Sequence, residues 1–337
     1  MKAAIFRGLE SIEVAEVPAP SPGPDEVLIK VRYCGICGSD VDAYKTGMYE
    51  PGIIIGHEFS GEIVGVGEAV SGWREGDRVT VNGVIPCGAC WFCHHGRPSL
   101  CEDMAMTGIT YHGAFAEFMV APARGLHRLP DEVSDRQAAL VDPLATALHG
   151  VRRSALKPGD RVLILGAGPI GLMTLQCALL AGARAVYASE ISPTRRGLAQ
   201  RLGATAVFDP RETNLYVALD EVTEGRGPDV VFECAGVPAT LQDAITLVRK
   251  GGQIMVVGIC EEPVEADFMT VVLNELEVRG AYCGHEEYPM ALDYLAQGRV
   301  EVDPLISHVI ALEEIVEKGF EVLAGPEPKA IKILVKF

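Results

Sequence analysis

The stretch Arg161-Val-Leu-Ile-Leu-Gly-Ala-Gly-Pro-Ile-Gly171 decides the fold class. Its apolar run, 162–165, predicts a buried strand, and a helical pattern begins after Gly171. Between them stands Gly166-x-Gly168-x-x-Gly171, the spacing of a turn that holds the pyrophosphate of a dinucleotide. The unpaired N–H groups and the dipole at the N-terminus of the following helix attract the phosphates. Pro169 costs little there, because an N–H in the first turn has no partner within the helix.

An acidic residue after the next expected strand separates this turn from an ordinary glycine-rich loop. The run Ala185-Val-Tyr-Ala-Ser is followed by Glu190, 19 positions after Gly171. An acid at that place accepts hydrogen bonds from the adenosine ribose and repels a 2′-phosphate. Without the glycine turn, Glu190 would be read as a solvated charge at a strand end. We therefore expect NAD to be preferred over NADP, with Arg195 and Arg196 close enough to soften the preference.

Length and composition exclude several classes of protein. The chain has 337 residues, of which 48% are hydrophobic, enough for two domains with a large core. Its formal net charge of −17 opposes binding to nucleic acid or anionic membranes. No apolar run reaches the roughly 18 residues of a membrane span, and residues 1–7 are too short an apolar stretch for a signal peptide. Ten cysteines without an export signal favour a cytoplasmic protein whose cysteines bind metal or stay free.

The pattern of expected elements divides the chain into three parts. Residues 1–142 contain several runs in which apolar and polar residues alternate, and glycines recur between them. Both features are typical of a compact, barrel-like β domain. Residues 143–285 alternate strand-like and helical runs in six units, which predicts a doubly wound parallel sheet of the α/β class. Residues 286–337 are expected to return to the first domain. They carry predicted helices over 290–296 and 312–323 and a final strand over 330–336.

Four closely spaced cysteines are the most specific local signal. Cys87-x2-Cys90-x2-Cys93-x7-Cys101 can close a tetrahedral zinc site with no open position for chemistry. Four free buried thiols are the alternative, and a DNA-binding zinc module is disfavoured by the acidic charge. We expect a structural zinc.

A second, dispersed set of residues could bind a catalytic metal. It comprises Cys37 in Cys34-Gly-Ile-Cys-Gly-Ser-Asp40 and the pair His57-Glu58. A thiolate, an imidazole and a carboxylate leave one exchangeable position on a zinc ion. From the residues alone, His57 could equally be a core histidine, and Cys34 competes with Cys37.

Together these motifs resemble the zinc-dependent medium-chain dehydrogenase/reductase superfamily, that of the alcohol dehydrogenases, over essentially the whole chain. The matching pieces are Cys37-Gly-Ser-Asp40, Gly56-His-Glu-Phe-Ser-Gly61 with its continuation to Gly67, the four-cysteine loop, Asp142-Pro-Leu and the glycine turn. Within the superfamily the chain resembles the 2,3-butanediol and sorbitol (polyol) dehydrogenases most, with threonine dehydrogenase nearby.

The resemblance implies a GroES-like β-barrel catalytic domain (1–142), an NAD-binding Rossmann domain (143–285) and a returning C-terminal segment (286–337). It implies hydride transfer between a secondary alcohol, a diol or polyol, and NAD. A threonine 3-dehydrogenase-like reaction on a β-hydroxy amino acid is the alternative. A non-catalytic nucleotide-binding protein is disfavoured, because it would not need the relay and ligand residues. A homotetramer or homodimer is also implied.

The resemblance also assigns the site residues. Cys37 and His57 become ligands of a catalytic zinc, which leaves Cys34 a bystander, and Glu58 and Asp142 share the carboxylate role. Ser39 matches the hydroxyl that relays the substrate proton. Residues expected along the cofactor are Gly166, Gly168, Pro169, Ile170, Gly171, Glu190, Arg195, Val257, Gly258 and Tyr282.

Two departures from the family pattern bear on the reaction. Related enzymes commonly carry a histidine five residues after the ligand cysteine, at the outer end of the proton relay, where this chain has Asp42. The loop 47–52 is short compared with the butanediol branch. That loop helps to shape the substrate pocket in related enzymes. Because it is short here, diols, sugar alcohols and threonine-like compounds are all compatible with the sequence as substrates.

Overall fold

The computed structural model describes residues 1–325 and 330–337. Contacts between Cα atoms divide them into two compact units. Unit 1 comprises Met1–Asp142, Tyr288–Gly298 and Val302–Phe337, and unit 2 comprises Pro143–Glu287 and Arg299–Glu301. None of the helices in the described part of the chain combines the length and apolarity needed to cross a bilayer.

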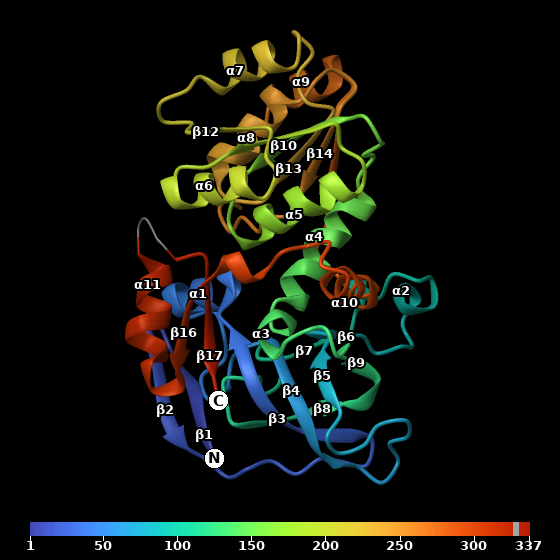
Figure 1. Cartoon of the computed structure of the whole chain (residues 1–337), viewed down its shortest axis with the longest axis vertical. Helices are drawn as coiled ribbons and strands as arrows, with labels where there is room; N and C mark the ends of the chain where they lie inside the picture. Colours follow the sequence, from blue (N-terminus) through green and yellow to red (C-terminus); the bar gives the residue numbers. More distant parts are fainter. Residues whose placement is uncertain (326–329) are drawn as a thin grey trace. The chain divides into compact units, whose positions relative to one another are not determined.

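Unit 2 is built on a six-stranded sheet in which every neighbouring pair runs parallel (Figure 1). All residues of the strands 161–165 and 185–189 are buried, and apart from Arg161, Tyr187 and Ser189 they are aliphatic. The order of the strands is that of a doubly wound Rossmann sheet, so the predicted fold class is confirmed. In spatial order the strands are β12 (Ala206–Phe208), β11 (Ala185–Ser189), β10 (Arg161–Leu165), β13 (Val230–Glu233), β14 (Gln253–Val256) and β15 (Glu277–Gly280).

Helices connect these strands, and three of them begin with proline in the first turn, where the missing N–H is tolerated. Apolar side chains of the connecting helices and the sheet form a common core that includes Leu163, Val231, Leu219 and Leu247. The helices are α5 (Pro169–Leu180), α6 (Pro193–Arg201), α7 (Leu215–Val222), α8 (Pro238–Leu247) and α9 (Phe268–Leu273).

Unit 1 is organised around a largely antiparallel seven-stranded sheet. Its main path runs β16-β17-β3-β4-β5-β9, and β8 also pairs with β3. The bounds are β16 (Ile306–Ala311), β17 (Lys332–Lys336), β3 (Glu26–Gly35), β4 (Glu58–Val66), β5 (Arg78–Val81), β9 (Leu126–Arg128) and β8 (Phe118–Pro122); β1 (Lys2–Gly8) with β2 (Ser11–Glu16), and β6 (Val84–Ile85) with β7 (Ala105–Met106), form two-stranded sheets.

The C-terminal part of the chain lies among the N-terminal strands (Figure 1). β17 pairs with β3, so that Leu334 stands opposite Gly35, and Gly35 in turn stands opposite Glu58 of β4. Phe320 and Ile333 belong to the same buried core as residues of β3. The helices of this unit are α1 (Gly38–Thr46), α2 (Trp91–His94), α3 (Asp135–Ala138), α10 (Tyr288–Ala296) and α11 (Glu321–Ala324), and α4 (Val141–Arg153) begins here and continues into unit 2.

One expected helix is wrong in detail. The sequence predicts a continuous helix over 312–323, but the structure has a 3₁₀ turn at Leu312–Glu314, a π-helix at Ile315–Phe320 and then α11. Gly319 lies in the π segment, and a Cβ there would come within 2.7 Å of Ile36 Cδ1. The widened turns thus accompany close packing of the backbone onto the core.

Candidate metal and dinucleotide sites

Three potential metal ligands gather at the end of β4 in unit 1. One donor atom from each of Cys37, His57 and Glu58 lies within 4.8 Å of the others. Cys37 is the residue before α1, with an extended backbone, and its N–H donates to Asp40 Oδ2 at 3.1 Å. Glu58 opens β4 and is 1% exposed. A thiolate, an imidazole and a carboxylate at this spacing match the donor set of an open zinc site.

Lys332 fixes the carboxylate of Glu58. Its Nζ donates to Glu58 Oε1 at 2.9 Å, to Oε2 at 2.6 Å and to the carbonyl oxygen of Ile36 at 2.9 Å. Gly35 lies between the two strands that carry the pair, and a Cβ there would stand 2.5 Å from Glu58 Oε2. A glycine is therefore needed for the ion pair to form across β3. Burial lowers the pKa of Lys332, but the negative charges of Glu58 and Cys37 and the hydrogen bond to Glu58 more than offset it, so that pKa is raised.

The carboxylate of Asp40 lies next to the imidazole of His57. His57 Nδ1 and Asp40 Oδ1 are 3.7 Å apart, and neither buried atom has a hydrogen-bond partner among the described residues. Burial lowers the pKa of His57, but the charges of Asp40 and Cys37 more than offset it and hold that pKa well above its ordinary value. The cluster therefore has an excess of negative charge that a cation would offset. A carboxylate behind a histidine also orients metal-binding imidazoles, so these residues fit a metal ion.

Asp142 lies outside the set of three donors and is held by a tyrosine. Tyr288 of α10 is fully buried, and its hydroxyl donates a short hydrogen bond to Asp142 Oδ1 and accepts the N–H of Gly83 at 3.1 Å. The ring of Tyr288 stacks on that of His127 with centroids 4.9 Å apart. Burial raises the pKa of Asp142, and His57 opposes this. Asp142 is thus oriented from a helix that follows it by more than a hundred residues.

The remaining residues named around the catalytic site have simpler surroundings. Ser39 is half-buried in the first turn of α1, and Asp42 is exposed one turn further on. Cys34 is fully buried in the core of unit 1, and burial raises the pKa of its thiol well above the ordinary value. Its sulfur is also close to the backbone of Gly56, where a Cβ would come within 2.9 Å. Cys34 therefore has the surroundings of a packing residue.

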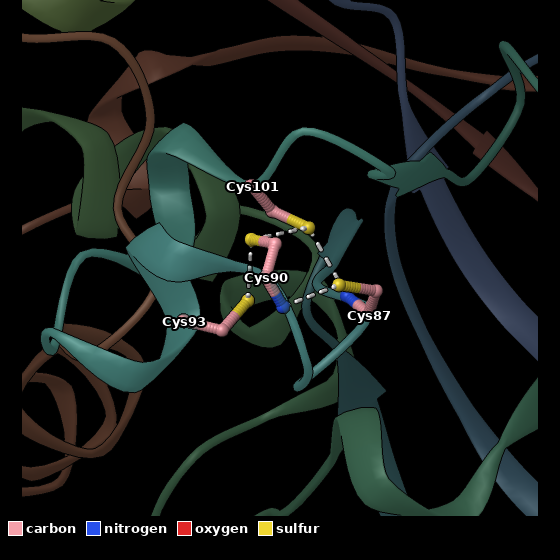
Figure 2. A group of neighbouring side chains, drawn as sticks. All are labelled: Cys87, Cys90, Cys93 and Cys101. Atoms are coloured by element: carbon pink, nitrogen blue, oxygen red, sulfur yellow. Dashed lines mark hydrogen bonds between the residues drawn. The ribbon is translucent and has the colours of Figure 1, made fainter.

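The four-cysteine loop forms a second compact donor cluster (Figure 2). All four sulfurs lie within 4.8 Å of one another; Cys90 Sγ is 3.5 Å from Cys93 Sγ and 3.9 Å from Cys101 Sγ. Four thiolates at about 2.3 Å from one zinc ion would be about 3.8 Å apart. Backbone N–H groups of Glu102 and Cys93 lower the pKa of Cys90 to about 6, and those of Ala89 and Cys90 lower the pKa of Cys87. Burial raises the pKa of Cys93 to about 12 and also raises that of Cys101. Two of the four thiols are thus predisposed to ionise by the backbone, and a zinc ion would stabilise the other two as thiolates.

The glycine turn of unit 2 has the tight geometry that the sequence predicts. Gly166 has φ +89°, and a Cβ at Gly171 would come within 1.9 Å of the Gly166 carbonyl oxygen. A Cβ at Gly168, just before α5, would meet only the end of Arg195, at 3.9 Å. Pro169 and Ile170 open α5. The turn therefore leaves a small cradle at the N-terminus of α5 that fits a pyrophosphate.

Glu190 follows β11 at the edge of this cradle. It is 6% exposed, and its two carboxylate oxygens accept the N–H groups of Ala167 and Ser192, both at 2.8 Å. The carboxylate is thereby aimed at the glycine turn rather than into solvent. Each oxygen keeps a lone pair that a ribose hydroxyl could use.

Glu233 is a residue of this unit that sequence reasoning missed. It is fully buried at the end of β13, where Oε1 accepts the N–H groups of Ala235 and Gly236 and the hydroxyl of Thr240, each at 2.8 Å. Its carbonyl accepts the N–H groups of Val257 and Gly258. Glu233 therefore connects two loops at the carboxyl edge of the sheet, where ligands of doubly wound sheets bind. Tyr282, which was expected along the cofactor, is by contrast 47% exposed.

Lys332, Asp40 and Tyr288 were also missed as functional candidates. Asp40 stood within the quoted Cys37-Gly-Ser-Asp40 motif, and Lys332 is a single charge in the apolar run 331–335. Both are signals that could have been used. Tyr288 carries no comparable signal, because a tyrosine at the start of a helix is an ordinary core residue.

Unit 1 carries two clusters of potential metal ligands, and unit 2 carries a pyrophosphate turn on a Rossmann sheet. This combination defines a class of protein: metal-dependent oxidoreductases that use a nicotinamide dinucleotide. Comparisons with known proteins place the chain within that class. Residues 23–131 match the alcohol dehydrogenase GroES-like domain, and residues 169–297 match the zinc-binding dehydrogenase family.

Two named dehydrogenases and one solved structure align over at least 94% of the chain. The (R,R)-butanediol dehydrogenase of Bacillus subtilis is 37% identical over 350 residues, covering 100% of this chain and 99% of that protein. The L-threonine 3-dehydrogenase of Alteromonas mediterranea is 36% identical over 325 residues, covering 94% of each. The crystal structure of a putative zinc-binding dehydrogenase from Sinorhizobium meliloti, bound to NADP, superposes with a TM-score of 0.93 at 37% identity, covering 100% of this chain and 99% of that one.

The chain belongs to the zinc-dependent alcohol dehydrogenases of the medium-chain dehydrogenase/reductase superfamily. It is an oxidoreductase that acts on CH–OH groups of small molecules, with zinc and a nicotinamide cofactor.

Proposed function

We propose that this enzyme oxidises a secondary alcohol of the diol or polyol type with NAD, and reduces the corresponding ketone in the reverse direction. The cluster of Cys37, His57 and Glu58 carries the proposal, since its donor atoms lie within 4.8 Å of one another. The 37% identity to a butanediol dehydrogenase supports the substrate class.

The residues divide between two metal positions. Cys37 and His57, with Glu58 or Asp142 as the carboxylate, would hold the catalytic zinc, and Cys87, Cys90, Cys93 and Cys101 the structural one. A zinc ion among the first set supplies Lewis acidity to an alcohol or carbonyl oxygen. Lys332 orients the carboxylate of Glu58 through two hydrogen bonds, and Tyr288 orients that of Asp142 through one. The two carboxylates are thus oriented independently.

The proton of the alcohol needs a path to solvent. Ser39 lies in the first turn of α1, two residues after Cys37, and its hydroxyl can both accept and donate a proton. Asp42, exposed on the same helix, would take the place of the usual histidine at the outer end of the path.

Glu190 is the basis for proposing NAD rather than NADP. Its carboxylate is buried and aimed at the glycine turn, where it would oppose the charge of a 2′-phosphate. A relative of known structure is bound to NADP, so affinities for both cofactors must be measured. Arg195, Val257, Gly258 and Tyr282 complete the proposed cofactor contacts. The hydride chemistry belongs to the nicotinamide.

We also propose a two-domain organisation and a homo-oligomer. Residues 1–142 with 286–337 would form the metal-bearing domain and 143–285 the nucleotide-binding domain; the two contact units support this division. Among the described residues β15 has a neighbour on one side only. Four apolar side chains of α9 are each more than two-thirds exposed: Phe268, Met269, Val272 and Leu273. Such an edge and apolar face suit pairing with a second copy. Light scattering after size exclusion would give a monomer if this is wrong.

A substrate panel tests the function. Butanediol stereoisomers, sorbitol and other polyols, and L-threonine would be offered with NAD and NADP, and reduction would be followed at the nicotinamide absorbance. We expect turnover of a vicinal diol or polyol with NAD. Turnover of L-threonine alone would favour the second candidate, which the 36% identity to a threonine dehydrogenase supports.

Cys37→Ala provides the control for the metal site. It should abolish turnover while the variant still binds NADH, because the glycine turn lies on unit 2. Cys34→Ala is the matched control, since Cys34 is a core residue three positions away. Normal turnover by Cys37→Ala would contradict the metal assignment.

A further inference from the structure

Two arginines lie beside the residue that is expected to read the ribose. Arg196 Nη1 donates to the carbonyl oxygens of Glu190 at 3.0 Å and Ile191 at 2.7 Å. Arg211 Nη2 donates to the same Ile191 carbonyl at 2.7 Å. Both guanidinium groups therefore stand within hydrogen-bond reach of the backbone that carries Glu190. Arginines at this place are the groups that accommodate the 2′-phosphate of NADP in Rossmann sites.

Asp209 accepts hydrogen bonds from both arginines. Its Oδ2 accepts Arg196 Nη1 at 2.7 Å and Arg211 Nη2 at 2.9 Å, and its Oδ1 accepts Arg211 Nε and the N–H of Arg211 at 3.0 Å. The fork of Arg211 is thus engaged by both oxygens of a single carboxylate. A phosphate monoester would need those same donors.

Burial makes this arrangement strong. The side chain of Asp209 is only 5% exposed, whereas those of Arg196 and Arg211 are 23% and 48% exposed. The hydrogen bond from Arg211 lowers the pKa of Asp209, so the carboxylate stays ionised throughout the physiological range. Asp209 follows β12, and β12 pairs with β11, the strand that ends before Glu190. The position of Asp209 beside the ribose site is therefore set by the sheet itself.

The net charge of these side chains bears on whether the site attracts a phosphate group. Arg196 and Arg211 are together offset by Asp209 and Glu190, so the four side chains carry no net charge. Arg195 lies at the glycine turn and adds a further positive charge. Asp209 nevertheless balances part of the charge of Arg196 and Arg211 and pairs with the donors that a phosphate dianion would use. Loss of the Asp209 charge would leave a net positive site with two available guanidinium groups.

We propose that Asp209 is a specificity-determining residue for the cofactor: it sequesters Arg196 and Arg211 and so withholds them from the 2′-phosphate of NADP. This inference rests on the proposed dinucleotide site at Glu190. Glu190 repels the phosphate directly, while Asp209 acts by pairing with the cations that would attract it. The preference for NAD is therefore built from two carboxylates on neighbouring strands.

The test is the affinity of the purified enzyme for NADH and NADPH, titrated by nucleotide fluorescence without any alcohol. We expect Asp209→Asn to tighten NADPH binding by about tenfold or more, which corresponds to about 1.4 kcal/mol, with NADH binding changed less than about threefold. Adding Arg211→Ala to this variant should remove most of the gain, because the guanidinium, not the loss of Asp209, would bind the phosphate.

Asp229→Asn is the matched control. Asp229 also pairs with an arginine, Arg249, at 2.6 Å and also has a lowered pKa, but it precedes β13 at the opposite, amino edge of the sheet. This variant should leave the ratio of the two affinities unchanged. Asp209→Ser serves as a second variant if Asp209→Asn fails to fold by circular dichroism.

The outcomes separate this inference from the function on which it rests. If the wild type prefers NADH and both Asp209 variants keep the NADH-to-NADPH ratio within about twofold, the role of Asp209 is wrong and the NAD preference stands. If the wild type binds NADPH as tightly as NADH, or binds neither, the NAD-site proposal and this inference are both overturned.

Discussion

Replacing Lys332 by methionine should destabilise unit 1 strongly. The change removes three hydrogen bonds, two to Glu58 and one to Ile36, from a side chain that is 3% exposed. It leaves the carboxylate of Glu58, 1% exposed, without its counter-charge. Removing one partner of a buried ion pair costs about 3–5 kcal/mol. For a domain of this size that corresponds to a fall in melting temperature of about 6–20 °C.

The assay is urea unfolding followed by tryptophan fluorescence. The two tryptophans of the chain, Trp73 and Trp91, both belong to unit 1, so the signal reports the unit that contains the substitution. We expect the loss to be smaller when zinc is present in excess, because a cation beside Glu58 replaces part of the missing charge. A smaller effect with zinc would also indicate that Glu58 faces the metal.

Two further variants make this prediction decisive. Glu58→Gln combined with Lys332→Met should recover stability to within about 1 kcal/mol of the wild type, since no unpaired buried charge remains. Lys318→Met breaks a pair with Glu314 in which the lysine side chain is 61% exposed, and should cost less than about 0.5 kcal/mol. The reasoning fails if Lys332→Met costs under about 1 kcal/mol, or if the double variant is no more stable than the single one.

Three other changes test separate parts of the structure. Cys93→Ser should lower the zinc content by about one ion per chain and reduce stability, as measured by metal analysis and thermal unfolding; unchanged zinc content would contradict a four-thiolate site. Tyr288→Phe should cost about 1–3 kcal/mol, because Asp142 and the Gly83 N–H both lose a partner, and should lower kcat with less effect on NADH affinity; equal loss of both would indicate a purely structural role. The pKa of Asp209 is lower in the folded state than its unfolded value of about 3.9. The carboxylate therefore stabilises the fold above that pH, and the stabilisation is lost as the pH falls below it. Asp209→Asn should lose less stability than the wild type between pH 5 and pH 3, as urea titrations at each pH would show.

Features encoded within a short stretch could be predicted from the sequence. The four cysteines lie within 15 residues, and local turns bring their sulfurs together. The glycine turn and Glu190 likewise follow from one strand, one turn and the next strand. Parallel strands buried on both faces give unbroken apolar runs, so the Rossmann sheet was predictable too.

The segment 312–323 shows where such reasoning stops. Its apolar spacing predicts one helix, but Gly319 packs its backbone against Ile36, and the chain adopts 3₁₀, π and α turns in succession. The competing influence is a tertiary contact with a residue almost 300 positions earlier. Periodicity within a window cannot register that contact.

The sequence by itself determined the chemistry that is available: thiolates, an imidazole, carboxylates and a phosphate turn, at spacings that local backbone geometry can close. Only the tertiary structure decided which groups restrain them. Lys332 meets Glu58 across 274 positions, because β17, β3 and β4 are neighbours and Gly35 between them lacks a side chain. Asp209 reaches Arg196 because β12 lies beside β11. Buried charges take their partners from sheet pairing, which depends on contacts far apart along the chain.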